Sequence, residues 1–198
     1  MINVSAIQDH VVSMLQKGLS VSLTYHGTGH TLDVTRQCMR IAAAEGITEG
    51  QALLELKIAA LYHDTGFMYV YQNHEERGCE LARNQLPGFG LTEKSIDNIC
   101  SIIMATKIPQ SPQNLLQQII CDADLDYLGR DDFFFIGEKL RKEMVAYKFV
   151  NGLKEWEERQ WSFLQSHHYF TKTSQQERAH LKERNMQKII DNKNKKGE

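Results

Sequence analysis

Apolar residues recur at steps of three and four along most of the chain. In the first segment this spacing joins Val4, Ile7, Val11 and Leu15, as on the buried face of an amphipathic helix. No stretch alternates apolar and polar residues at period two, and all three prolines fall between the helical patterns. The spacing therefore predicts an all-α fold.

Further helices are predicted between His30 and Glu45, over 133–144 and over 153–163. The run Phe133-Phe134-Phe135 is expected to lie in the core. From Asp191 to Glu198 no apolar residue is available to bury, so this end is expected to be frayed or disordered. Other helices are expected to start at polar residues that can cap a first turn, namely Thr48, Asn73, Thr92, Ser111 and Ser174.

Composition limits the classes of partner and the cellular setting. A formal charge of -2 and a pI near 6.4 argue against a basic nucleic-acid binder. The chain shows neither a signal-peptide pattern nor an apolar run of membrane-spanning length. Its four cysteines are widely separated among apolar residues, which is typical of buried reduced thiols. We therefore expect a soluble cytoplasmic protein with an acidic or small-molecule partner.

An adjacent histidine and aspartate, His63-Asp64, stand where an apolar helix runs into Gly66. An imidazole and a carboxylate at a helix end can turn their lone pairs toward a single point. His30 shares a helix face with apolar residues, so it is expected to point inward. Asp124 continues an apolar stripe at four-residue steps, where a carboxylate is costly unless it is paired or bound to a metal. These four residues are candidate metal ligands.

The order His, then His-Asp, then Asp resembles the HD superfamily of metal-dependent phosphohydrolases, from about Tyr25 to Arg130. The resemblance implies a helical bundle over 1–150, followed by a C-terminal helical extension with a polar tail over 151–198. It implies that His30, His63, Asp64 and Asp124 bind the metal. Asp124 is preferred over Asp122 because family members with D-x-D at this point use the second aspartate. Asp122 and Asp126 are then expected to support the ligands or cap a helix.

The resemblance also implies roles in catalysis and substrate binding. His26 matches the residue that protonates the leaving group in cyclic-nucleotide phosphodiesterases, while a loop histidine bonded to the backbone is the alternative. Asp64 is expected to take part in catalysis as well as in metal binding. His74 is a candidate for a second metal, for substrate contact or for helix capping. Lys107 and Arg130 are candidates for binding a substrate phosphate.

Two imidazoles and two carboxylates suit a divalent ion such as Mn, Fe, Mg, Zn, Ni or Co. Such an ion lowers the pKa of bound water from about 15.7 toward about 7. The expected reaction is hydrolysis of a phosphate ester or anhydride of a small molecule, a nucleotide, by metal-bound hydroxide. One alternative is a non-catalytic nucleotide-sensing or partner-binding module, with the polar C-terminal helices forming a homodimer or partner surface. The other is a diiron oxygenase.

Overall fold

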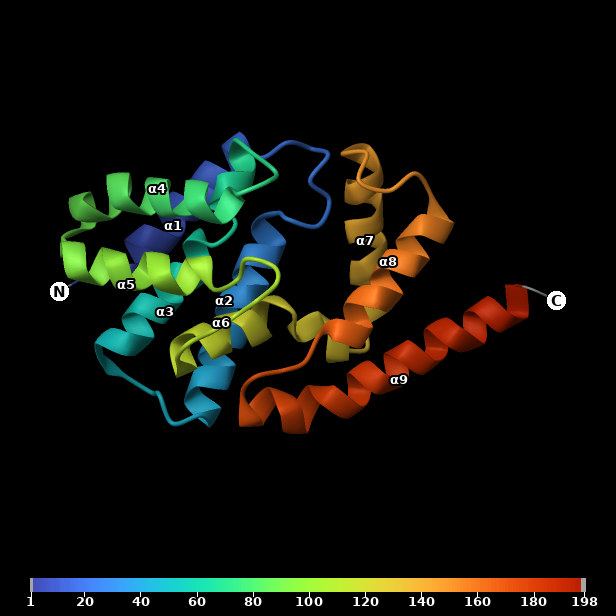
Figure 1. Cartoon of the computed structure of the whole chain (residues 1–198). Coiled ribbons are helices and arrows are strands. Elements are labelled where there is room, and N and C mark those ends of the chain that lie inside the picture. Colours follow the sequence, from blue (N-terminus) through green and yellow to red (C-terminus); the bar gives the residue numbers. More distant parts are fainter. Residues whose placement is uncertain (1, 197–198) are drawn as a thin grey trace.

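The computed structural model describes residues 2–196, in which helices are joined by loops, and for 193–196 only the backbone is described. This part contains no strand, so the all-α prediction is confirmed. Three short 3-10 helices are η1 (Thr65–Met68), η2 (Leu86–Phe89) and η3 (Asp126–Gly129). The α-helices in Figure 1 are α1 (Val4–Gly18), α2 (Thr28–Ala44), α3 (Gly50–Tyr62), α4 (His74–Gln85), α5 (Glu93–Met104), α6 (Leu115–Asp124), α7 (Phe133–Ala146), α8 (Leu153–Ser166) and α9 (Lys172–Lys196).

The larger hydrophobic core lies among α1 to α6. Helix α3 packs against α2 and α5, and its residues from Glu55 to Tyr62 are buried except Lys57. A helix that is apolar nearly all round must be covered on every side. Its C-terminal end therefore carries His63 and Asp64 directly into the interior of the bundle.

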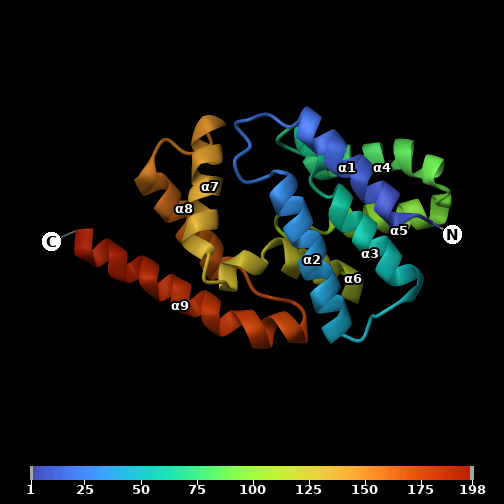
Figure 2. The ribbon, with the colours of Figure 1, turned by 180° about the vertical axis from the view of Figure 1, so that it is seen from behind.

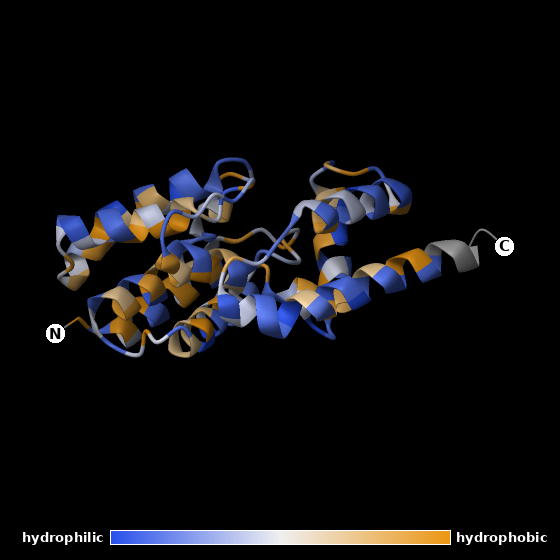
Figure 3. Cartoon of the chain, turned by 60° about the horizontal axis from the view of Figure 1, so that its bottom comes forward, coloured by the Kyte–Doolittle hydropathy of each residue, from blue (hydrophilic) through white to orange (hydrophobic). Residues whose placement is uncertain are grey.

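A second, smaller core forms where α7, α8 and α9 meet η3. It joins Leu128 and Phe133 to Leu164 and Ile189. Figures 1 and 2 both place α7 and α8 side by side, across α2 from α4 and α5, with α9 running below them. Hydrophobic residues are interleaved with hydrophilic ones along the C-terminal helix in Figure 3. Since this core draws on residues before and after 150, the predicted domain boundary there stays a prediction.

Two of the predicted helix starts are correct, because α4 begins directly after Asn73 and α5 directly after Thr92. Thr92 caps α5, because its Oγ1 accepts the backbone N–H of Ser95 at 3.3 Å. Ser111 does not cap α6, since Asn114 accepts the N–H of Gln117 at 3.1 Å and the helix begins three residues later than expected. Asn73 stands at the start of α4 but makes no capping hydrogen bond with its side chain. The predicted starts at Thr48 and Ser174 are wrong, because α3 begins at Gly50 after Glu49 and Ser174 lies inside α9.

Two other expectations need correction. Phe133 is fully buried, but Phe134 and Phe135 are 41% and 66% exposed, because successive helical residues point in different directions. The predicted disorder from Asp191 is wrong as far as Lys196, where α9 ends, and Gly197 and Glu198 lie outside the described residues.

The four cysteines are free and buried, which confirms that prediction. Within residues 2–196, no helix combines the length and apolar character that a membrane span requires.

Candidate metal centre and flanking cavities

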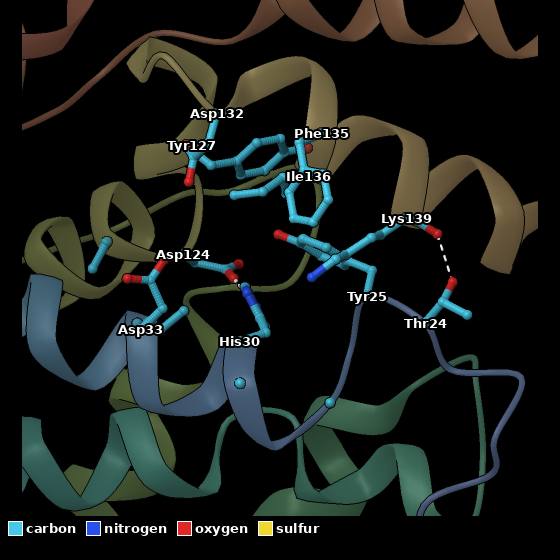
Figure 4. A pocket seen from close by; sticks show the side chains of 14 residues that line it. Thr24, Tyr25, His30, Asp33, Asp124, Tyr127, Asp132, Phe135, Ile136 and Lys139 are labelled. Carbon is cyan, nitrogen blue, oxygen red and sulfur yellow. Dashed lines mark hydrogen bonds and ion pairs between the residues drawn. The ribbon is translucent and has the colours of Figure 1, made fainter.

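Three helix ends bring the four predicted ligands together. His30 lies in the first turn of α2, His63 and Asp64 follow α3, and Asp124 ends α6. Nε2 of His30 lies 3.0 Å from Oδ1 of Asp124 and 3.3 Å from Oδ2 of Asp64. Nε2 of His63 lies 3.2 Å from the same Asp64 oxygen and 3.6 Å from Oδ1 of Asp124. Figure 4 shows His30 turned toward Asp124.

The donor atoms of this cluster fit a divalent cation. Nδ1 of His63 lies 2.8 Å from the carbonyl oxygen of Ala60, which can only accept, so Nδ1 carries a hydrogen, and in the neutral imidazole that binds a metal Nε2 has the lone pair. Nε2 of His63 and Oδ2 of Asp64 are buried and make no hydrogen bond. Buried polar atoms are costly without a partner. The ligand atoms of His30, His63 and Asp124 all lie within 4.8 Å of one another.

Charge is balanced inside the cluster. Burial by itself raises the pKa of the Asp64 carboxyl, but the charges of the neighbouring histidines, that of His63 above all, outweigh it, so the pKa lies well below its usual range. Burial also opposes ionisation of Asp124, but the hydrogen bond of His30 and the charge of His63 outweigh it and lower its pKa. Both carboxylates are therefore ionised at neutral pH, as metal binding requires.

Glu143 on α7 holds the loop that carries His26. Its side chain is fully buried, and Oε2 accepts the backbone N–H groups of Tyr25 at 2.9 Å and of His26 at 3.0 Å. Oε1 pairs with Nδ1 of His26 and accepts the hydroxyl of Tyr71 at 2.9 Å. Burial lowers the pKa of His26, but Glu143 and the charge of Asp64 outweigh it, so the pKa is raised. The ring of His26 is thus held by a side chain.

Sequence reasoning missed Glu143. A signal was present, because Glu143 is spaced three residues from Leu140 and lies within the apolar stripe of its helix. A buried carboxylate requires a partner, and the same argument identified Asp124.

His74 lies at the edge of the cluster. Its Nε2 is 3.6 Å from Oδ1 of Asp64, and its Nδ1 lies 3.1 Å from the carbonyl oxygen of Tyr71. Phe67 stacks on the rings of both His74 and His26, with centroid separations of 3.8 Å and 4.1 Å. The structure thus places His74 beside Asp64, and its role stays a prediction.

Lys107 and Arg130 line neither of the two cavities described below. Lys107 pairs with Glu76 and donates to Oδ1 of Asn73 at 3.1 Å. Arg130 is bound by carboxylates, with its Nη1 2.6 Å from Asp33 and its Nη2 2.5 Å from Asp132. Both charges are neutralised within the protein, and the substrate role expected of them stays a prediction.

Asp122 and Asp126 hold the C-terminal segment. Asp122 accepts the N–H of Phe170 at 2.8 Å, and the N–H and hydroxyl of Thr171 at 2.8 Å and 2.7 Å. Oδ1 of Asp126 accepts from Arg40 at 2.9 Å and from Arg178 at 2.8 Å. These aspartates therefore bind other parts of the protein, which leaves Asp124 as the D-x-D residue in the cluster.

Two cavities open onto the cluster. The first, about 340 Å³, is lined by His30, Asp124 and the α7 residues Phe135 and Lys139, which surround it in Figure 4. The second, about 300 Å³, is lined by His26, Asp64 and His74 and also by residues of α7 and α8. A small molecule can therefore approach the cluster from two directions.

Comparisons with known proteins agree with this arrangement. A family model described as HD domain matches residues 27–126. The fold is similar to the crystal structure of a predicted HD superfamily hydrolase from an uncultured Thermotogales bacterium, with a TM-score of 0.54 and 21% identity over 81% of this chain and 98% of that chain. A search of curated proteins finds no match.

The matched residues make up half of the chain and include the four predicted ligands. The match supports a metal-dependent hydrolase in general terms. The chain belongs to the HD domain family.

Proposed function

We propose that this chain is a metal-dependent phosphohydrolase that cleaves a phosphate ester or anhydride of a small molecule, a nucleotide. His30, His63, Asp64 and Asp124 would hold one divalent ion. The observation that carries the proposal is the pair of buried atoms without hydrogen bonds, Nε2 of His63 and Oδ2 of Asp64, among carboxylate and imidazole donors. When bound, such an ion stabilises charge on phosphoryl oxygens and lowers the pKa of water toward about 7.

His26 would donate a proton to the leaving oxygen. It lines the second cavity together with Asp64, and its raised pKa keeps the imidazole protonated to higher pH than usual. A general acid is most effective when its pKa lies near the working pH. Glu143 would position His26 by fixing both its backbone and its Nδ1. His74 is a candidate for contacting the substrate or a second ion.

The metal site is tested by elemental analysis of the purified protein. Wild type is compared with Asp124→Ala, and with Asp131→Ala as a matched control because the side chain of Asp131 is 91% exposed. We expect one metal per chain in wild type and in the control, and none in Asp124→Ala. Circular dichroism checks that the variant remains folded.

Phosphate release from a panel of nucleotides is then measured with the same three proteins. Release by wild type and the control, and its loss in Asp124→Ala, would support a phosphohydrolase. A wild-type protein that neither contains nor binds a divalent ion would refute the proposal. Tight nucleotide binding without product would instead favour the sensing module, and two irons per chain would favour the oxygenase. A cytoplasmic location and a homodimer stay predictions from the sequence.

A further inference from the structure

Helix α8 forms one wall of the second cavity. It contributes Trp156, Arg159, Gln160 and Phe163, and it lies outside the segment that matches the HD domain model. The same cavity is also lined by His26 and Asp64. The part of a ligand that extends away from the metal cluster on this side therefore meets residues that the family match does not describe.

The cavity suits an uncharged ring. Its lining is mainly apolar and aromatic, including Phe67, Tyr71, Trp156 and Phe163. A phosphate placed against these aromatic side chains would lose its hydration without compensation, whereas a planar ring can stack on them. A volume of about 300 Å³ is at the lower end for small-molecule sites, so one ring system fits better than two.

The position of His26 decides which part of the substrate occupies this cavity. A proton donor must lie within hydrogen-bond reach of the leaving oxygen. His26 lines the second cavity and does not line the first. The group attached to the leaving oxygen therefore lies in the cavity with α8, while the phosphoryl group faces the metal cluster.

Two polar side chains of α8 have hydrogen-bonding capacity left for a ligand. Gln160 is half-buried, and its amide has no hydrogen-bond partner among the described residues. Arg159 makes only a long contact of 3.5 Å to the carbonyl oxygen of Phe149, and within the described part of the chain it has no ion-pair partner. An amide both donates and accepts, so Gln160 can match the edge of a nucleobase.

Building on the proposed function, we infer that the cavity against α8 binds the nucleobase of a nucleoside monophosphate, with Phe163 stacking on the ring and Gln160 contacting its edge. Water adds to phosphorus, and the bond from phosphorus to the nucleoside oxygen breaks. His26 gives its proton to that oxygen, and a proton from the attacking water restores His26. The products are a nucleoside and inorganic phosphate.

The test compares substrates that differ only in the ring. For wild type, Phe163→Leu, Gln160→Ala and Glu158→Ala, kcat/KM is measured for nucleoside 5′-monophosphates and for ribose 5-phosphate. Leucine keeps apolar volume at 163, and Gln160→Ala removes no hydrogen bond made within the described residues. Glu158 is exposed on α8 and does not line the cavity, so it provides a matched control.

The preference for nucleotide is kcat/KM for the nucleotide divided by kcat/KM for ribose 5-phosphate. We expect Phe163→Leu to lower this preference about tenfold, which corresponds to a free-energy difference of about 1.4 kcal/mol. Gln160→Ala should change the preference among the bases, and Glu158→Ala should leave the ratio as in wild type. A second measurement is calorimetric binding of adenosine without metal. We expect binding by wild type, and about tenfold weaker binding by Phe163→Leu.

The outcomes separate this inference from the proposed function. Phosphate release with the same ratio in wild type and Phe163→Leu would overturn the role of the cavity and leave the phosphohydrolase intact. Absence of release from every substrate, with adenosine binding still weakened by Phe163→Leu, would support the cavity although the proposed function had failed. A wild-type kcat/KM for ribose 5-phosphate that equals or exceeds the value for every nucleotide would overturn the assignment of a ring.

Discussion

Glu143 offers the sharpest test of how the site is held together. Its fully buried carboxylate accepts two backbone N–H groups and a tyrosine hydroxyl and pairs with His26. Glu143→Ala leaves these four groups without their acceptor. An unsatisfied buried donor costs about 1–3 kcal/mol, but such losses do not add fully, and breaking a buried charge pair costs about 3–5 kcal/mol. We expect the free energy of unfolding to fall by about 3–5 kcal/mol.

Urea unfolding followed by circular dichroism measures this change. In a chain of this size about 1 kcal/mol lowers Tm by roughly 2–4 °C, so Tm should fall by about 10 °C. Glu138→Ala is the matched control on the same helix. Glu138 pairs with Arg141 at a half-exposed position, and such surface pairs contribute less than about 1 kcal/mol.

The reasoning would be refuted if the two variants lost the same amount of stability. That result would mean that Glu143 does not anchor the loop carrying Tyr25 and His26, and that water or another group satisfies the donors equally well. A loss of stability in Glu143→Ala alone would show that α7 holds the loop at the site.

Two further predictions concern the same region. Glu143 favours the charged form of His26, so Glu143→Gln should lower the pKa of His26 and move the basic limb of the kcat/KM profile to lower pH; an unmoved limb would argue against His26 as the proton donor. Gly66→Ala should destabilise the fold by about 1–3 kcal/mol or more, because a Cβ at Gly66 would lie 1.9 Å from the carbonyl oxygen of His74. The control Gly88→Ala, whose Cβ would meet nothing within 4 Å, should keep the wild-type Tm.

The sequence predicted the all-α fold and the residues of the candidate cluster because their signals are local. His30 lies on the inner face of its helix, His63 and Asp64 stand at a helix end, and Asp124 interrupts an apolar stripe. Each pattern can be recognised without knowing the tertiary structure. The structure then brings these four side chains within reach of one another.

Pairings between distant residues could not be predicted in the same way. Glu143 meets His26 across 117 positions of sequence, and no periodic pattern encodes such a contact. Lys107 and Arg130 were expected to be available for phosphate because the sequence does not show that Glu76 and two aspartates neutralise them. Whether a charge is available depends on packing between helices, which spacing along one helix does not determine.

Membership of the HD domain family says little about the substrate, because the candidate metal ligands and the wall of the second cavity lie in different parts of the chain. The matched segment, 27–126, contains the candidate ligands, but Glu143 and the aromatic wall of α8 lie beyond it. His26 lies just before it and is held by Glu143. A related chain could keep the metal cluster and still change its substrate by altering α8, because the residues proposed to contact the leaving group are separate from those that would hold the ion. If Gln160 and Phe163 bind the base as proposed, the substrate of one such protein can be inferred from that of another only when the two agree at these residues as well as at His63 and Asp64.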